Sequence, residues 1–275
     1  MNMKNWKRGA AFVALACLTA LEAAAQGFPN KPLRIIAPYA PGGTVDVLCR
    51  EIASRLGAVF GQQVLVDNRA GAGGMIGAEA IARAAADGYT MGMLATPHAA
   101  PPHAMKLAFD PAKDFSFITR VAVVPGLLSV NAAVEVKSLQ ELLALARMKP
   151  GQLTYGQPGN LSAGHLAMEL LKVQTGVNIV SVPYKGGGPA MVDLLSGQIH
   201  MMISGPTAQL PHVKSGKLRA IATTGSKRST GVPEVPTIAE SGVPGFELNE
   251  WYGMAAPAGT PRDALARLNA EIVRA

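Results

Sequence analysis

The sequence has 275 residues, of which 49% are hydrophobic and 5% aromatic, and its formal net charge is +7 at pH 7. A chain of this length builds one large or two ordinary domains with a substantial core. Aromatic side chains are too few for a base-stacking surface and the basic residues are scattered, so we expect no nucleic-acid partner. The modest positive excess slightly favours small anionic molecules.

The N-terminus has the pattern of a secretory signal peptide. Three basic residues precede an apolar run from Gly9 to Leu21, and alanines at 23–25 provide a cleavage site before Gln26. The run is short for a membrane helix. We therefore expect residues 1–25 to be removed, which lowers the net charge from +7 to +5, and the mature protein to be periplasmic. A lipoprotein signal that ends at Cys17 is the alternative, although Ala-Leu-Ala before it resembles a lipobox poorly.

The first mature segments predict a strand, a glycine loop and a helix. Leu33–Ala37 is apolar and typical of a short buried strand, and Gly42 and Gly43 permit a tight turn and close approach to a ligand. Thr44 is expected to cap the helix that follows, in which Cys49 is a buried small hydrophobic residue without a disulfide partner. Such a loop directs N–H groups and a helix dipole at one point, which suits an anion. An ordinary strand-to-helix turn is the alternative.

The next elements extend the same arrangement. We expect a strand at 63–67, a glycine-rich loop at 68–74, a helix at 75–86 and a strand at 89–95, a βαβαβ order that implies a parallel sheet with helices on both faces. The loop glycines (71, 73 and 77) are spaced one residue wider than the dinucleotide-binding fingerprint, so a turn is favoured over a nucleotide site.

Residues 96–120 are proline-rich and predicted to be irregular. Thr96 and Pro97 directly follow a strand's carboxyl end, where open α/β sheets bind ligands. His98 and His103 have no carboxylate or cysteine at ligand spacing, so a metal site is not expected.

A second α/β series begins at residue 127. The expected strands and helices alternate as before: a strand at 127–130, a helix capped by Ser138, a strand at 153–155, a helix at 163–175, a strand at 179–182, a glycine loop and helix from 185, a strand at 199–203, a helix at 206–213 and a strand at 218–224. The glycine loop lacks the Walker spacing and so does not indicate phosphate transfer. Two similar α/β halves suggest two parallel-sheet lobes around a cleft.

Ser162 admits a catalytic and a binding interpretation. Its G-N-L-S-A-G context is one residue longer than the hydrolase elbow, and His165 is too close in sequence to act as that fold's late histidine base. A serine hydrolase, or a dinucleotide enzyme built on the Gly71–Gly77 loop, is therefore the weaker alternative. Ser162 is better placed to cap the following helix and to offer its hydroxyl and N–H groups to an anion.

Eight segments in a fixed order cover most of residues 31–261: APYAPGGTVD (37–46), VDNRAGAGGMIGAEAIARAAADGYT (66–90), FDPAKDFSFI (109–118), YGQPGNLSAGHLAMELL (155–171), VPYKGGGPAMVDLLSGQI (182–199), GKLRAIATT (216–224), PEVPTIAESGVPGFE (233–247) and WYGMAAPAGTP (251–261). Together they resemble the Bug family, the periplasmic receptors of tripartite tricarboxylate transporters. The resemblance implies a bilobal α/β fold of the type II-like periplasmic binding proteins, which closes over a small carboxylate and has no chemistry or cofactor of its own.

From the resemblance and these patterns we expect a monomer that delivers its ligand to membrane transporter subunits. A periplasmic sensor that presents the ligand to a membrane kinase is an alternative. The expected ligand-binding residues are Tyr39, Ala40, Gly42, Gly43, Thr44, Asp46, Thr96, Pro97, Gly159, Leu161, Ser162, His165, Ser204 and Thr207. No catalytic or metal-binding residue is expected.

Three departures from the family pattern are visible. Val45 stands where the family usually has threonine, and Gln157 and Leu161 alter the G-S-x-G-x-G-S loop, with Leu161 expected to narrow the pocket. Family members also continue past residue 275, so the chain is expected to be a C-terminally shortened form. We predict residues 26–124 with 251–275 as the first lobe and 125–250 as the second, with hinges near 124–126 and 250–253.

Overall fold

The computed structural model describes residues 27–99 and 107–274. The predicted signal peptide, its cleavage before Gln26, the Cys17 alternative and His103 lie outside these residues. Within the described ranges, no helix combines the length and apolar character needed to span a bilayer.

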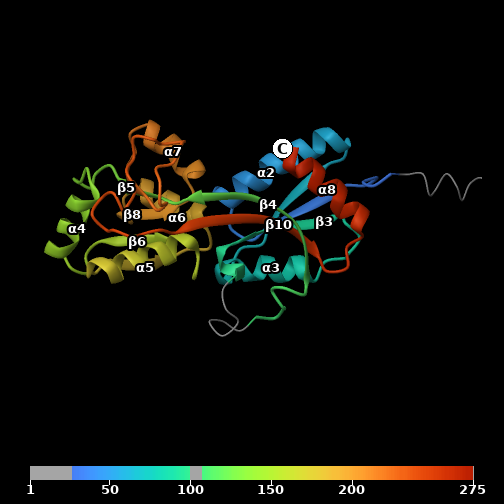
Figure 1. Ribbon diagram of the computed structural model, residues 1–275, viewed down its shortest axis with the longest axis horizontal. Coiled ribbons are helices and arrows are strands. Elements are labelled where there is room, and N and C mark those ends of the chain that lie inside the picture. Colours follow the sequence, from blue (N-terminus) through green and yellow to red (C-terminus); the bar gives the residue numbers. More distant parts are fainter. Residues whose placement is uncertain (1–26, 100–106, 275) are drawn as a thin grey trace, which may run out of the picture.

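The first lobe is built on a five-stranded sheet in the order β2-β1-β3-β10-β4. Its strands are β1 (Leu33–Ala37), β2 (Val64–Asn68), β3 (Thr90–Ala95), β4 (Phe115–Pro125) and β10 (Asn249–Pro257). Helices α2 (Thr44–Phe60) and α8 (Arg262–Arg274) cover one face, and α3 (Met75–Ala82) covers the other (Figure 1). Short 3-10 turns at Ala72–Gly74 (η1) and Thr96–Ala99 (η2) follow β2 and β3.

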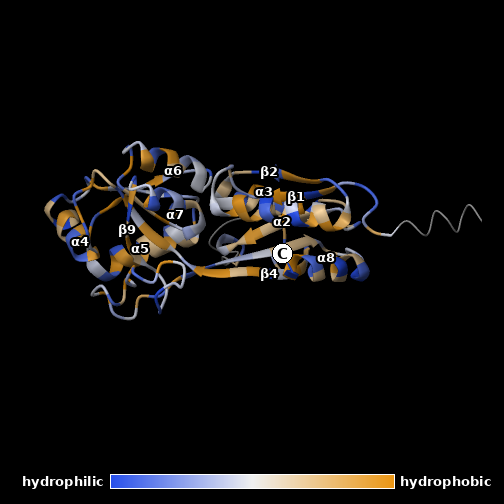
Figure 2. Cartoon of the chain, turned by 90° about the horizontal axis from the view of Figure 1, so that it is seen from above, coloured by the Kyte–Doolittle hydropathy of each residue, from blue (hydrophilic) through white to orange (hydrophobic). Residues whose placement is uncertain are grey.

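The second lobe has a five-stranded sheet in the order β7-β6-β8-β5-β9. Its strands are β5 (Leu127–Asn131), β6 (Thr154–Gln157), β7 (Val180–Pro183), β8 (Met201–Ser204) and β9 (Leu218–Thr223). Helices α4 (Leu139–Met148) and α5 (Ala163–Thr175) pack on one face and share the largest core of this lobe, whereas α6 (Gly187–Leu195) and α7 (Pro206–Lys214) pack on the other. Seen from above, apolar segments lie toward the sheets of both lobes (Figure 2).

Both sheets are mixed, whereas the sequence order predicted parallel ones. In the first sheet β1 pairs in parallel with β2 and β3, but β10 is antiparallel to β3 and β4. In the second sheet β6 pairs in parallel with β7 and β8, but β5 is antiparallel to β8 and β9. The cause in the first sheet is the path of the chain: β4 leads out of the first lobe, so β10, which returns beside it, must run in the opposite direction.

The two lobes are joined by β4 and β10, which run side by side between them (Figure 1). The prediction that residues 96–120 are irregular is wrong from Phe115 onward, because β4 begins there. Thr224 connects the segments next to these two strands. Its hydroxyl accepts from the Gly126 N–H, just after β4, at 2.7 Å and donates to the Leu248 carbonyl, just before β10, at 2.5 Å. The predicted hinge segments thus lie at the end of β4 and within the first half of β10.

Local predictions were mostly confirmed at helix starts. Ser138 caps α4 by accepting from the Glu141 N–H at 3.2 Å, and Cys49 is buried on α2. Thr44 does not cap α2 as predicted; Gly43 occupies the N-cap position without a side-chain bond. Helix α3 ends at Ala82, four residues before the predicted end.

Candidate ligand-binding site

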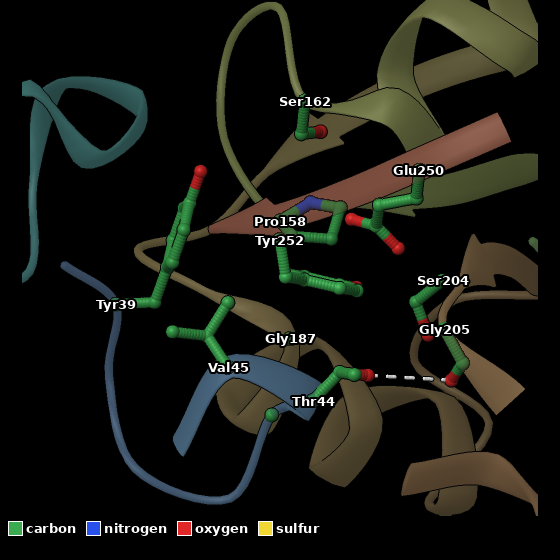
Figure 3. Close-up of a pocket in the computed structure, with 11 residues that line it drawn as sticks. Tyr39, Thr44, Val45, Pro158, Ser162, Gly187, Ser204, Gly205, Glu250 and Tyr252 are labelled. Carbon is green, nitrogen blue, oxygen red and sulfur yellow. Dashed lines mark hydrogen bonds between the residues drawn. The ribbon is translucent and has the colours of Figure 1, made fainter. Parts of the chain in front are cut away.

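A small pocket lies between the lobes, with a volume of about 30 Å³. One water molecule needs about 10–15 Å³ of such volume, so the pocket has room for about two water molecules. Elements of both sheets surround it (Figure 3). The residues that line it are Tyr39, Gly43, Thr44, Val45, Glu250 and Tyr252 from the first lobe and Pro158, Ser162, Gly187, Ser204 and Gly205 from the second.

The starts of four helices meet at this pocket. Gly43 is the N-cap of α2, Ser162 that of α5 and Gly205 that of α7, and Gly187 is the first residue of α6. The first turn of a helix carries N–H groups without intrahelical partners and the positive end of the helix dipole. Four such ends around one cavity give it a positive potential without a positively charged side chain, an arrangement that suits an anion.

The lobes are in direct contact beside the pocket. The Ala40 N–H donates to the Lys185 carbonyl at 3.0 Å, and the Thr44 hydroxyl donates to the Gly205 carbonyl at 3.3 Å. Figure 3 shows this second bond, which Thr44 makes as the first residue of α2, one position after the N-cap Gly43. The structure is therefore a closed form, held by two hydrogen bonds from the glycine loop to the second lobe.

Glycine is required where the two backbones approach. A β-carbon on Gly188 would overlap the Pro41 carbonyl oxygen and lie 2.9 Å from its carbonyl carbon. The loop at Gly71–Gly77 makes a similar contact, because a β-carbon on Gly73 would lie 2.5 Å from the Asn160 carbonyl oxygen. Of the three glycines that partly matched a dinucleotide fingerprint, Gly73 thus lies at a lobe-to-lobe contact.

Asp46 supports the glycine loop from behind. Its carboxylate accepts from the Gly42 N–H at 3.0 Å, from Arg50 at 2.9 Å and from the Asn68 amide at 3.0 Å. Burial raises the pKa of this carboxyl, but the hydrogen bonds from Arg50, Gly42 and Asn68 outweigh it and hold the pKa below its usual value. Asp46 therefore fixes Gly42, whose φ of 87° is in the left-handed region, and does not itself reach the pocket.

Two tyrosines and a glutamate complete the wall. The Tyr39 hydroxyl donates to the Gly73 carbonyl at 3.1 Å, and burial keeps the pKa of Tyr39 above its usual value. Burial also raises the pKa of Tyr252, as does the nearby Glu250 carboxyl. The pKa of Glu250 is raised by burial, which outweighs hydrogen bonding with Tyr252. Both hydroxyls are therefore neutral hydrogen-bonding groups at physiological pH.

The structure brings five of the residues expected from the sequence to the pocket: Tyr39, Gly43, Thr44, Ser162 and Ser204. The others lie around it without lining it: Ala40, Gly42 and Asp46 in and behind the glycine loop, Thr96 and Pro97 at the end of β3, Gly159, Leu161 and His165 beside Ser162, and Thr207 in the first turn of α7. Leu161 consequently does not narrow the cavity.

Sequence reasoning missed six lining residues: Val45, Pro158, Gly187, Gly205, Glu250 and Tyr252. A local signal existed for the two glycines, since each directly follows a glycine or serine at a predicted helix start. None existed for Glu250 and Tyr252, which reach the pocket only because β10 returns between the lobes.

The arrangement around Ser162 is that of a helix cap. Its hydroxyl accepts from the His165 N–H at 3.3 Å, while the His165 ring Nδ1 accepts from the Leu161 N–H at 3.1 Å. Within residues 27–99 and 107–274, no histidine ring bonds the Ser162 hydroxyl, and no group of three His, Cys, Asp or Glu side chains could hold a metal ion. His98 instead bonds the Pro111 carbonyl at 2.8 Å and packs against Phe115.

Two α/β lobes joined by a pair of crossing strands, with a pocket between them, define a bilobal solute-binding protein. Residues 48–275 match the model of the tripartite tricarboxylate transporter family receptor (TctC), and the chain belongs to this family. The family and the structures similar to this chain are solute-binding proteins and not enzymes.

Individual relatives agree with this assignment. The chain is 40% identical to protein BugT of Bordetella pertussis over 267 residues, which are 95% of this chain and 81% of BugT. It resembles the structure of R. palustris Rpa4515 with adipate, with a TM-score of 0.86 and 39% identity over 89% of this chain and 83% of that one. For MatC (Rpa3494) from Rhodopseudomonas palustris with bound malate, the TM-score is 0.83 and the identity 33%, over 90% and 85% of the two chains.

Proposed function

We propose that this protein is a monomeric periplasmic receptor that captures a small carboxylate between its lobes and delivers it to the membrane subunits of a tripartite tricarboxylate transporter. The observation that carries the proposal is the meeting of four helix N-termini, from both lobes, at one pocket. Membership in the TctC family supports the transport role.

The ligands of relatives support a carboxylate. Adipate and malate, named with the structures of Rpa4515 and MatC, are both dicarboxylates. In this chain the N–H groups at the start of α2 would bind one carboxylate, with the Ser162 hydroxyl and the start of α5 opposite. In the closed form the Thr44 hydroxyl donates to the Gly205 main-chain carbonyl, which holds Thr44 beside the cavity.

Closure is the proposed means of capture and release. Residues 26–124 with 251–275 would move as one lobe and 125–250 as the other, about the crossing of β4 and β10. A ligand that contacts both lobes stabilises only the closed form, so it shifts the population toward closure. The transporter subunits would then recognise the closed form.

A thermal-shift screen of carboxylates and their neutral amides tests this function. At about 100 times the dissociation constant, a ligand stabilises the protein by about 2.7 kcal/mol, which raises the melting temperature by about 5–10 °C. We expect this shift for at least one acid and almost none for its amide. An amide that stabilises as well as its acid would contradict an anion site formed by helix N-termini.

A further inference from the structure

Glu250 places an acidic side chain inside a pocket otherwise suited to an anion. It alternates along β10 with Trp251, so it shares one face of the strand with Tyr252. Both side chains line the pocket, and Figure 3 shows the Glu250 carboxyl turned toward the space beside Tyr252 and Ser204.

The carboxyl of Glu250 has no counter-charge. None of the ion pairs within residues 27–99 and 107–274 includes it, and no described Lys, Arg or His lines the pocket. Asp46 offers a contrast, since its carboxylate bonds Arg50, Asn68 and the Gly42 N–H. The Glu250 carboxyl shares a hydrogen bond with Tyr252 but has no such cationic partner, and a partly buried carboxylate without one is costly unless a ligand supplies it.

The size of the cavity brings any second charge of the ligand close to Glu250. Glu250 lines the same small pocket as the helix starts, so a ligand carboxylate held by the helix N-termini leaves its neighbouring atoms beside the Glu250 carboxyl. A second carboxylate there would meet a like charge, whereas an ammonium group would form a charge-assisted hydrogen bond.

We propose that the ligand is a compact amino-carboxylate, whose carboxylate lies at the helix N-termini and whose ammonium group pairs with Glu250. The proposal rests on the carboxylate-receptor function above and names its substrate class. Glu250 then selects against simple dicarboxylates, although relatives are seen with adipate and malate.

Calorimetric titration with matched pairs of probes tests the proposal on the mature protein. The pairs are alanine with propionate, aspartate with succinate, and glutamate with glutarate; the second member of each lacks only the amino group. In the pair that binds, we expect the amino acid to bind about 10- to 100-fold more tightly, the factor that one charge-assisted hydrogen bond supplies. Equal or tighter binding of the deamino acid would overturn the proposal.

Two variants locate the effect. Glu250→Gln keeps the shape of the side chain but removes its charge, so we expect it to bind both members of the pair alike. Glu247→Gln removes the same charge from an exposed residue nearby, whose carboxylate bonds the Asn249 amide, and should retain the full preference. An amino preference that survives Glu250→Gln would refute the role of Glu250.

The pH dependence gives a second readout that does not depend on a variant folding. Tyr39 and Tyr252, the titratable groups that face Glu250 across the pocket, remain neutral because their pKa values are raised. Among these three groups only the Glu250 carboxyl changes its charge, so the amino preference should shrink as the pH falls and this carboxyl becomes neutral. Tighter succinate or glutarate binding at low pH would instead show a protonated Glu250 that donates to a second carboxylate, and would overturn the proposal.

The outcomes separate this proposal from the function it rests on. If propionate, succinate or glutarate binds while the amino acids do not, the carboxylate receptor stands and the amino-carboxylate class is wrong. If no acid of any kind stabilises the protein, both are wrong.

Discussion

Replacing Gly188 with alanine should prevent closure without harming the fold. Gly188 lies in the first turn of α6, where its backbone conformation accepts any residue and alanine favours the helix by up to about 1 kcal/mol over glycine. In the closed form, however, the new methyl group would overlap the Pro41 carbonyl oxygen and lie 3.3 Å from the Gly42 Cα. Both contacts are with backbone, which cannot rotate away, so the lobes must stay apart.

The loss in affinity follows from the contacts between the lobes. Separation breaks the bonds from Ala40 to Lys185 and from Thr44 to Gly205. At about 1 kcal/mol each, the loss of these two hydrogen bonds raises the dissociation constant about 30-fold. The loss of ligand contacts to the second lobe would raise it further. A ligand at about 100 times the wild-type constant would then stabilise the variant by only about 0.9 kcal/mol instead of about 2.7 kcal/mol.

Thermal melting and small-angle scattering measure this prediction. The unliganded Gly188→Ala protein should melt at or above the wild-type temperature, and saturating ligand should produce no compaction. Gly187→Ala is the matched control for closure, because its β-carbon would lie 3.5 Å from the Gly43 Cα, an ordinary contact. If Gly188→Ala compacts and binds like wild type, the closed arrangement described here is not the ligand-bound one.

Three further predictions follow. Ser162→Ala should lower the unfolding free energy by about 1 kcal/mol through loss of the α5 cap, and calorimetry should show weaker ligand binding if the hydroxyl also bonds the ligand. The depressed pKa of Asp46 contributes stability that is fully present above the unfolded-state pKa of about 4 and is lost as the pH falls through the folded value. Asp46→Asn should therefore destabilise the protein at pH 7 and flatten its acid unfolding curve, whereas Glu51→Gln, which breaks an exposed pair on the same helix, should change little. Mass spectrometry of the exported protein should find Gln26 at its N-terminus, and an intact Met1 would contradict the predicted processing.

Local sequence patterns predicted the elements on which the pocket is built. The strand, glycine loop and helix from Leu33 onward were found as expected, and Ser162 caps α5. These predictions succeeded because apolar periodicity, glycine conformations and capping hydroxyls act between residues close in sequence.

Contacts between distant residues could not be predicted in this way. Thr44 fits a helix cap by its local pattern, but its hydroxyl donates to Gly205, 161 residues away. The first sheet is mixed because β10 enters between β3 and β4 after the whole second lobe has been built. Glu250 and Tyr252 reach the pocket through the same return of the chain, and no short-range motif marks them.

A crystal structure with the tightest-binding acid from the screen tests the central claim most directly. The account predicts closed lobes, with one ligand carboxylate oxygen within about 3.2 Å of an N–H group at the start of α2 and another near Ser162 or the start of α5. A carboxylate bound outside the pocket between the lobes, or bound there by lysine or arginine side chains while the helix N-termini contact only water, would contradict it.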